Sequence, residues 1–120
     1  MVDREEIALN LPLNHVARSV KIGIIGDTVL TDAIPAGYRI KSIVVEETAG
    51  NAITGGLKIG TSAGGTQVVN GQAVGANALV DCALGTVIFS TSAGQTLYVE
   101  DVTSWNSASL DLWIQLERVN

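Results

Sequence analysis

Residues 34–69 read IPAGYRIKSIVVEETAGNAITGGLKIGTSAGGTQVV, and this stretch decides the fold. Apolar and β-branched runs of a strand's length alternate in it with short segments that contain glycine. Such runs are typical of β-strands, and glycine beside proline, asparagine or a second glycine marks a tight turn. The pattern predicts short strands joined by turns, with Gly37 supplying a positive φ and Gly55-Gly56 forming a bulge.

The same pattern continues on both sides of this stretch. Apolar residues occupy every second position over residues 20–24. In the last strand, Leu110, Leu112, Ile114 and Leu116 face one way. Residues 39–48 are β-branched and apolar on both faces around Ile43-Val44-Val45, which predicts a central strand covered on both sides. Further strands are expected at residues 28–30, 53–60, 67–70, 79–84, 86–90 and 96–101. About nine short strands without helical periodicity predict an all-β fold, an antiparallel, jelly-roll-like β-sandwich of eight to nine strands.

The N-terminal segment is expected to form an arm or edge strand over residues 1–13, followed by one sandwich domain over residues 14–120. Ile7, Leu9, Leu11 and Leu13 recur at every second position, so one face of this strand is apolar. Pro12 cannot donate a ladder hydrogen bond, which favours a place at a sheet edge. Ile7, Leu9 and Leu11 are therefore candidate contacts to a neighbouring chain.

Composition indicates a surface that another subunit covers in part. The chain has 120 residues, which suits one domain, and 47% of them are hydrophobic. Only 16% are charged, against about 25% in average proteins. Outward apolar positions are expected at Ile25 and Val45, which also favours burial by another chain.

The charge pattern argues against nucleic acid and membrane as partners. The net charge is −5, and the seven Lys and Arg residues are scattered without forming a basic stripe. The N-terminus has no apolar core of a signal peptide, and no apolar run reaches the ~20 residues that span a bilayer.

Catalytic chemistry is sparse, and we expect no enzyme and no cofactor. His15 is the only histidine and Cys82 the only cysteine, and Cys82 lies in an apolar run where a buried thiol is expected. Glu46 and Glu47 are neighbours on a strand and so point to opposite faces. A calcium site would need scattered aspartates to meet in space, since no Asp-x-Asp spacing supports one.

Trp105 and Trp113 are the sharpest candidates for an interaction site. Trp113 stands on the polar face of the last strand, and Trp105 in the loop before it. Either may be read as packing under a loop or a second sheet, or as an exposed anchor of the kind enriched at protein interfaces. An exposed ring could also stack on a sugar.

Three segments together resemble small β-sandwich proteins of tailed bacteriophages, of the capsid-decoration and head-fibre-base type. They are residues 34–40, 51–61 and 64–69, and the resemblance covers roughly residues 30–119. The resemblance implies a virion structural protein that forms homo-oligomers, with a trimer favoured, and that contacts the major capsid protein or another virion protein. It also implies a place in the virion after assembly in the host cytoplasm.

The function expected on this basis is a capsid decoration protein that stabilises the head surface. The chain lacks the heptads of a fibre shaft, which favours decoration over a receptor-binding fibre. The alternatives are a receptor-binding domain of a tail or head fibre and a carbohydrate-binding module that uses Trp105, Trp113 and Tyr98.

Overall fold

The computed structural model describes residues 17–85 and 93–119, and this part of the chain contains eight β-strands and no helix. The strands are β2 (Ala17–Ile24), β3 (Thr28–Ile34), β4 (Tyr38–Glu47), β5 (Leu57–Gly60), β6 (Val69–Gln72), β7 (Leu79–Asp81), β8 (Gln95–Asp101) and β9 (Leu110–Arg118). The predicted all-β class is confirmed. None of the described segments is a helix long and apolar enough to cross a membrane.

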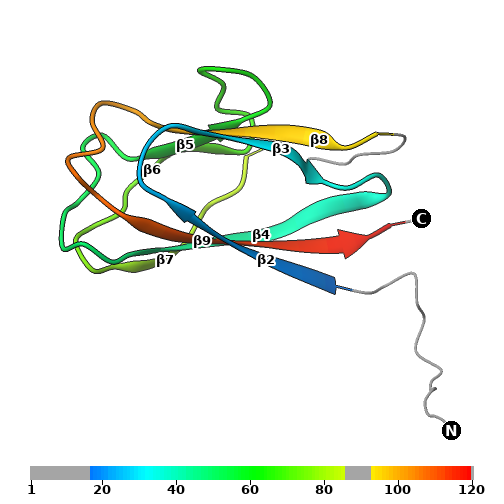
Figure 1. Cartoon of the computed structure of the whole chain (residues 1–120), viewed down its shortest axis with the longest axis horizontal. Helices are drawn as coiled ribbons and strands as arrows, with labels where there is room; N and C mark the ends of the chain where they lie inside the picture. Colours follow the sequence, from blue (N-terminus) through cyan, green and yellow to red (C-terminus); the bar gives the residue numbers. More distant parts are fainter. Residues whose placement is uncertain (1–16, 86–92, 120) are drawn as a thin grey trace, which may run out of the picture.

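The strands form two four-stranded antiparallel sheets that lie face to face (Figure 1). One sheet has the order β2-β9-β4-β7 and the other β3-β8-β5-β6. The pairing is nested, because β2 pairs with β9, β3 with β8, β4 with β7 and β5 with β6. This is a long hairpin rolled into two layers, so the predicted jelly roll is confirmed.

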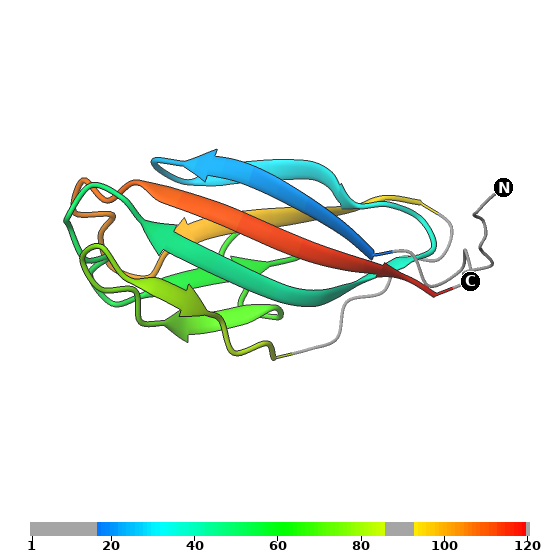
Figure 2. The ribbon, with the colours of Figure 1, turned by 90° about the horizontal axis from the view of Figure 1, so that it is seen from below.

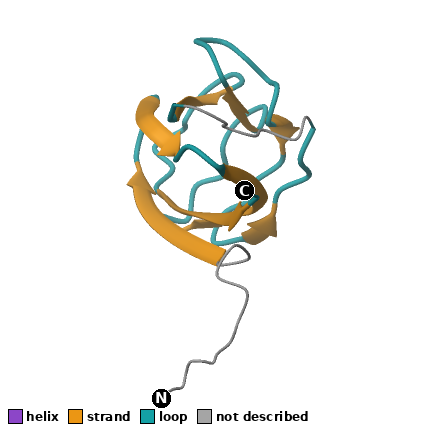
Figure 3. Cartoon of the chain, turned by 90° about the vertical axis from the view of Figure 1, so that its right-hand side faces the viewer, coloured by secondary structure: helices purple, strands orange, loops and turns teal. Residues whose placement is uncertain are grey.

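The core fills the space between the layers, and β9 contributes most regularly to it. Leu110, Leu112, Ile114 and Leu116 are all buried, while the residues between them are half-buried or exposed. This is the alternation predicted for the last strand. Figure 2 shows β9 between β2 and β4, and the end-on view in Figure 3 shows the strands curving around one interior.

Strand β4 has a neighbour on each edge, as predicted, but only one of its faces is buried. Ile43, Val45 and Glu47 are fully buried, whereas Val44 and Glu46 are half-buried on the outer face. The prediction of cover on both sides is wrong for the described chain, and so is the outward position of Val45. An uninterrupted Ile-Val-Val run fits either phase of a strand, so the sequence does not decide which residue points inward.

Turn residues set where the strands begin. Gly37 has φ 84°, as predicted. Gly55 and Gly56 have φ 80° and 96°, and two such residues in succession interrupt a strand, so β5 begins only at Leu57. Strand β6 begins later than predicted and β7 ends earlier. The strands predicted at residues 7–13 and 86–90 lie outside the described residues, as does the boundary between arm and domain.

Candidate interaction surfaces

The outer face of the β2-β9-β4-β7 sheet presents an aromatic centre with a charged rim. Trp113 stands on β9, opposite Lys21 of β2 and Val44 of β4. The Lys21 ammonium lies 5.5 Å from the centre of the Trp113 ring, within cation–π range. The ammonium also lies 3.7 Å from the Asp111 carboxylate.

A shallow hollow of about 340 Å³ lies beside Trp113 on this face. It is lined by Ser19, Val44, Glu46, Leu79, Trp113 and Gln115. Leu79 is 67% exposed, which is high for a leucine in a strand. An aromatic ring among aliphatic side chains, with polar groups around them, is the composition found at the centre of protein interfaces. We call these six residues together with Lys21 the Trp113 face.

Trp105 has a different environment in the loop between β8 and β9. Its indole Nε1 donates a hydrogen bond of 2.7 Å to the Asp27 carboxylate, and its ring packs against the core. Asp27 lies in the turn between β2 and β3, so this hydrogen bond links the β8–β9 loop to the β2–β3 turn. Of the two tryptophans, Trp105 thus has an internal structural contact, while Trp113 lies on an outer sheet face.

Tyr98 stands on the outside of the other sheet. It alternates with the buried Leu97 and Val99 on β8 and pairs with Val29, which is more than half exposed. Because the two sheets lie face to face around the core, the outward-pointing Tyr98 and Trp113 lie on opposite sides of the molecule. The structure therefore does not bring Trp105, Trp113 and Tyr98 together on one surface for stacking on a sugar.

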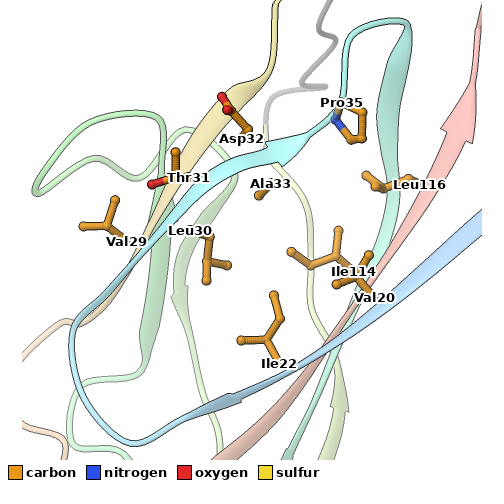
Figure 4. A pocket seen from close by; sticks show the side chains of 10 residues that line it. All are labelled: Val20, Ile22, Val29, Leu30, Thr31, Asp32, Ala33, Pro35, Ile114 and Leu116. Atoms are coloured by element: carbon orange, nitrogen blue, oxygen red, sulfur yellow. The ribbon is translucent and has the colours of Figure 1, made fainter.

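An apolar groove of about 530 Å³ opens between the edge strands β2 and β3 (Figure 4). Its walls come from three strands: Val20 and Ile22 of β2, Leu30 and Ala33 of β3, and Ile114 and Leu116 of β9. Val29, Thr31, Asp32 and Pro35 also line it. This groove could not be predicted from the sequence, because it depends on which two strands become sheet edges.

Strand β3 is irregular along this groove. Its pairing with β8 shifts register between Leu30 and Ile34, and Asp32 between them has φ 53°. Strand β2 pairs with β9 over all eight residues without a break. The groove therefore has one regular edge strand and one bulged edge strand.

Glu47 is a buried carboxylate that joins three loops, and the sequence analysis did not single it out for this role. It accepts five backbone N–H hydrogen bonds. Oε1 accepts from Gly50 (2.7 Å), Asn51 (3.0 Å) and Asn77 (3.0 Å), and Oε2 accepts from Ala49 (2.8 Å) and Ser109 (3.1 Å). These donors belong to the turn after β4, the turn before β7 and the loop before β9.

Burial raises the pKa of the Glu47 carboxyl, but the backbone hydrogen bonds outweigh it. Donors at Asn77, Ser109, Ala49 and Gly50 favour the charged form and lower the pKa to about 2, from an ordinary value of 4.5. An ionised carboxylate with all its oxygens engaged is a structural group. The available signal in the sequence was a glutamate in the buried phase of a strand directly before a glycine turn.

Cys82 is buried, as predicted, and forms no disulfide. Burial raises the pKa of its thiol to about 11, with the nearby Asp81 carboxylate adding to the effect. His15 lies outside the described residues, as do Ile7, Leu9 and Leu11. Within residues 17–85 and 93–119, no three His, Cys, Asp or Glu side chains are grouped so that they could hold a metal ion.

Comparisons with known proteins find a similar fold but no matching family model and no matching curated protein. Among solved structures, the fold is similar to a chain of a "Cyanophage Pam1 capsid asymmetric unit", with a TM-score of 0.55 and 14% sequence identity. The match covers 91% of this chain and 89% of that one, so the two share a fold over nearly their whole lengths.

Proposed function

We propose that the chain is a non-enzymatic structural protein of a phage virion, and specifically a capsid decoration protein that binds the outer head surface as a homo-oligomer. The observation that carries the proposal is the fold likeness to a chain of a cyanophage capsid, which extends over 91% of this sequence. The sequence resemblance to phage β-sandwich proteins points the same way and was drawn from different features, namely the strand and turn residues 34–69.

The two side chains with shifted pKa values in the described part of the chain, Glu47 and Cys82, support a structural role. The Cys82 thiol is buried with a raised pKa, so it is a poor nucleophile. The Glu47 carboxylate is occupied by backbone donors. Both side chains are buried in the fold, as expected of a protein that acts by contact.

The mechanism we propose is burial of the Trp113 face against a neighbouring virion protein. Apolar area contributes ~25 cal/mol per Å² when it leaves water, and the entropy lost on association offsets much of this gain. An oligomer that attaches at several points regains affinity through effective concentration. Many weakly bound copies could in this way reinforce a shell against the pressure of its packaged DNA.

Protein analysis of purified virus particles tests the role. Particles are purified on a density gradient from a lysate in which the gene is expressed, and peptides of this chain are quantified against those of the major capsid protein. We expect the chain at a fixed ratio to the major capsid protein in every particle fraction. Absence from particles, with the chain recovered only in the free protein fraction, would overturn the proposal.

A matched pair of variants tests the surface. Trp113→Ala should weaken binding to heads that lack the protein by about tenfold or more, because central aromatic residues dominate interface energetics. Tyr98→Ala removes an aromatic side chain from the opposite outer face and should leave binding within about twofold, as for most truncations outside the interface. Equal losses in both variants, or a loss only in Tyr98→Ala, would place the contact elsewhere.

A further inference from the structure

Strand β2 offers a regular sheet edge. It pairs with β9 along its whole length, and it stands first in the order of its sheet, so no other described strand lies on its second edge. Proteins commonly interrupt such an edge with a bulge, as β3 does here between Leu30 and Ile34. An unbroken edge of eight residues is a template on which another strand can add.

The groove beside this edge is incompletely filled. Ile24, the last residue of β2, is fully buried. Val20 and Ile22, nearer the start of the strand, are only half-buried and line the groove. Every second side chain of a strand added to β2 would point into the groove, and the others would point outward. The groove therefore suits a strand that carries aliphatic residues at alternate positions.

Residues 7–13 have this pattern. Ile7, Leu9, Leu11 and Leu13 alternate with Ala8, Asn10 and Pro12, and the segment is seven residues long beside a strand of eight. Pro12 falls in the outward phase, and a proline is tolerated on an edge strand. The same proline would stop further strands from adding to the new edge.

The numbering of the two strands indicates which chain supplies the segment. Directly opposite residues share a face, so the odd-numbered apolar residues of the segment must stand opposite Val20 and Ile22. In a hairpin within one chain, this pairing requires a loop with an even number of residues. A loop of two residues would be Asn14-His15, which lacks the glycine favoured in such turns. A loop of four would include Ala17, which already belongs to β2.

A segment from a second copy needs no hairpin loop, so neither the length nor the composition of residues 14–16 restricts it. We propose that residues 7–13 of one subunit add to β2 of a neighbouring subunit, on the edge that no described strand occupies, with Ile7, Leu9 and Leu11 in the groove. Because arm and groove are different surfaces of one chain, the contact is either exchanged between the two copies of a dimer or passed from copy to copy around a ring. This inference rests on the homo-oligomer of the proposed function and deepens it by naming what holds the copies together, and it requires no capsid.

Light scattering on a gel-filtration column tests the arm in the full chain. The wild type should have the mass of a closed oligomer. Leu9→Asp should shift the mass to that of a monomer, because a charge in an apolar groove is strongly disfavoured. Asn10→Asp places the same charge on the outward phase and should keep the oligomer. A monomeric wild type, or equal behaviour of the two variants, would overturn the proposal.

Disulfide trapping distinguishes the two sources of the segment. A tagged chain with Leu9→Cys is mixed with an untagged chain with Val20→Cys, both in a Cys82→Ser background, and oxidised. We expect a tagged–untagged heterodimer on a non-reducing gel. A control chain carries both Leu9→Cys and Val20→Cys. If it forms only an internal disulfide and no cross-linked dimer, the arm pairs with its own β2 and the proposal fails. Neither experiment involves virus particles, so these results stand apart from the test of the virion role.

Discussion

At the scale of the residue, Glu47 holds one end of the sandwich together. Its carboxylate is the common acceptor for backbone donors in three separate loops. These loops lie far apart in the sequence, and the carboxylate adds to the direct backbone hydrogen bond from Thr48 N–H to the Ser109 carbonyl. A buried backbone N–H without a partner is destabilising, so one side chain stabilises several loop conformations at once.

Replacing this carboxylate should lower stability well beyond the effect of an ordinary surface change. In Glu47→Gln, the amide NH₂ would face the three backbone donors at the Oε1 position or the two at the Oε2 position, depending on which way the side chain turns. We expect a fall in Tm of several degrees, measured by circular dichroism at pH 7. Glu46→Gln is the matched control, because Glu46 lies on the outer face of the same strand and should change Tm little. Similar falls in both variants would contradict the assignment.

The pH dependence of stability follows from the lowered pKa of Glu47. The folded-state pKa of about 2 lies below the ordinary value of 4.5, so the native protein binds this proton less readily than the unfolded chain. The stabilisation is complete above pH 4.5 and is lost as the pH falls toward 2. Denaturant titrations across this range should show a steep loss in the wild type and a flatter one in Glu47→Gln. Parallel curves would contradict the prediction.

Gly56 is a position where only glycine fits. Its φ is 96°, and an added Cβ would lie 2.8 Å from the Gln72 carbonyl oxygen. Gly56→Ala should cost about 1–3 kcal/mol in denaturant unfolding from backbone strain alone. Gly23→Ala is the control, because nothing lies within 4 Å of its added Cβ, and it should be neutral or slightly stabilising. A neutral Gly56→Ala would show that the β5–β6 backbone shifts freely.

Residue identity allowed the buried thiol of Cys82 and the positive φ of Gly37 to be predicted. It did not allow the phase of Ile43-Val44-Val45 to be predicted, because each of the three is apolar enough for either face. The role of Glu47 was missed for a related reason. A glutamate is ordinarily exposed, and only the three-dimensional meeting of distant loops makes its burial favourable.

At the scale of the element, β9 is the strand on which one sheet depends. It pairs with β2 on one edge and β4 on the other, and its inward residues lie in the middle of the core. Its alternation was the clearest in the sequence, and the structure confirms it. Strands β5, β6 and β7 were placed less well, because their lengths are set by turn geometry and by partners distant in sequence.

One pair of identical substitutions measures the importance of this strand. Leu112→Ala on β9 removes a fully buried side chain and should cost about 2–5 kcal/mol in denaturant unfolding. Leu79→Ala makes the same change on the edge strand β7, where the side chain is 67% exposed, and should cost less than about 0.5 kcal/mol. Comparable costs at both positions would mean that Leu79 is buried in solution, for example by another subunit.

At the scale of the whole molecule, Cys82 reports on the cooperativity of the sandwich. The thiol is buried, and its raised pKa keeps it protonated at pH 8. Reaction with a coloured thiol reagent at pH 8 should therefore be slow in the native protein. The rate should rise with denaturant in parallel with unfolding seen by circular dichroism. Fast reaction without denaturant would indicate local opening near β7.

The architecture of the molecule could be predicted further than its surfaces. Strand number, class and the jelly-roll type follow from spacing and alternation, which are local properties of the sequence. The separation of Trp105, Trp113 and Tyr98, and the groove between β2 and β3, follow from which strands become neighbours and which become edges. Sheet order is decided by long-range pairing, and the local pattern carries little information about it.

The nested order of the strands also governs when the fold can form on the ribosome. The strand between β2 and β4 is β9, which follows all the other described strands in the chain. Until it emerges, β2 and β4 have no common neighbour, and the apolar faces of both remain uncovered in the nascent chain. The second sheet waits only for β8, which joins β3 to β5. The β2-β9-β4-β7 sheet is therefore completed only after β9 has been made, so a truncated product that lacks β9 would leave β2 and β4 without their shared neighbour.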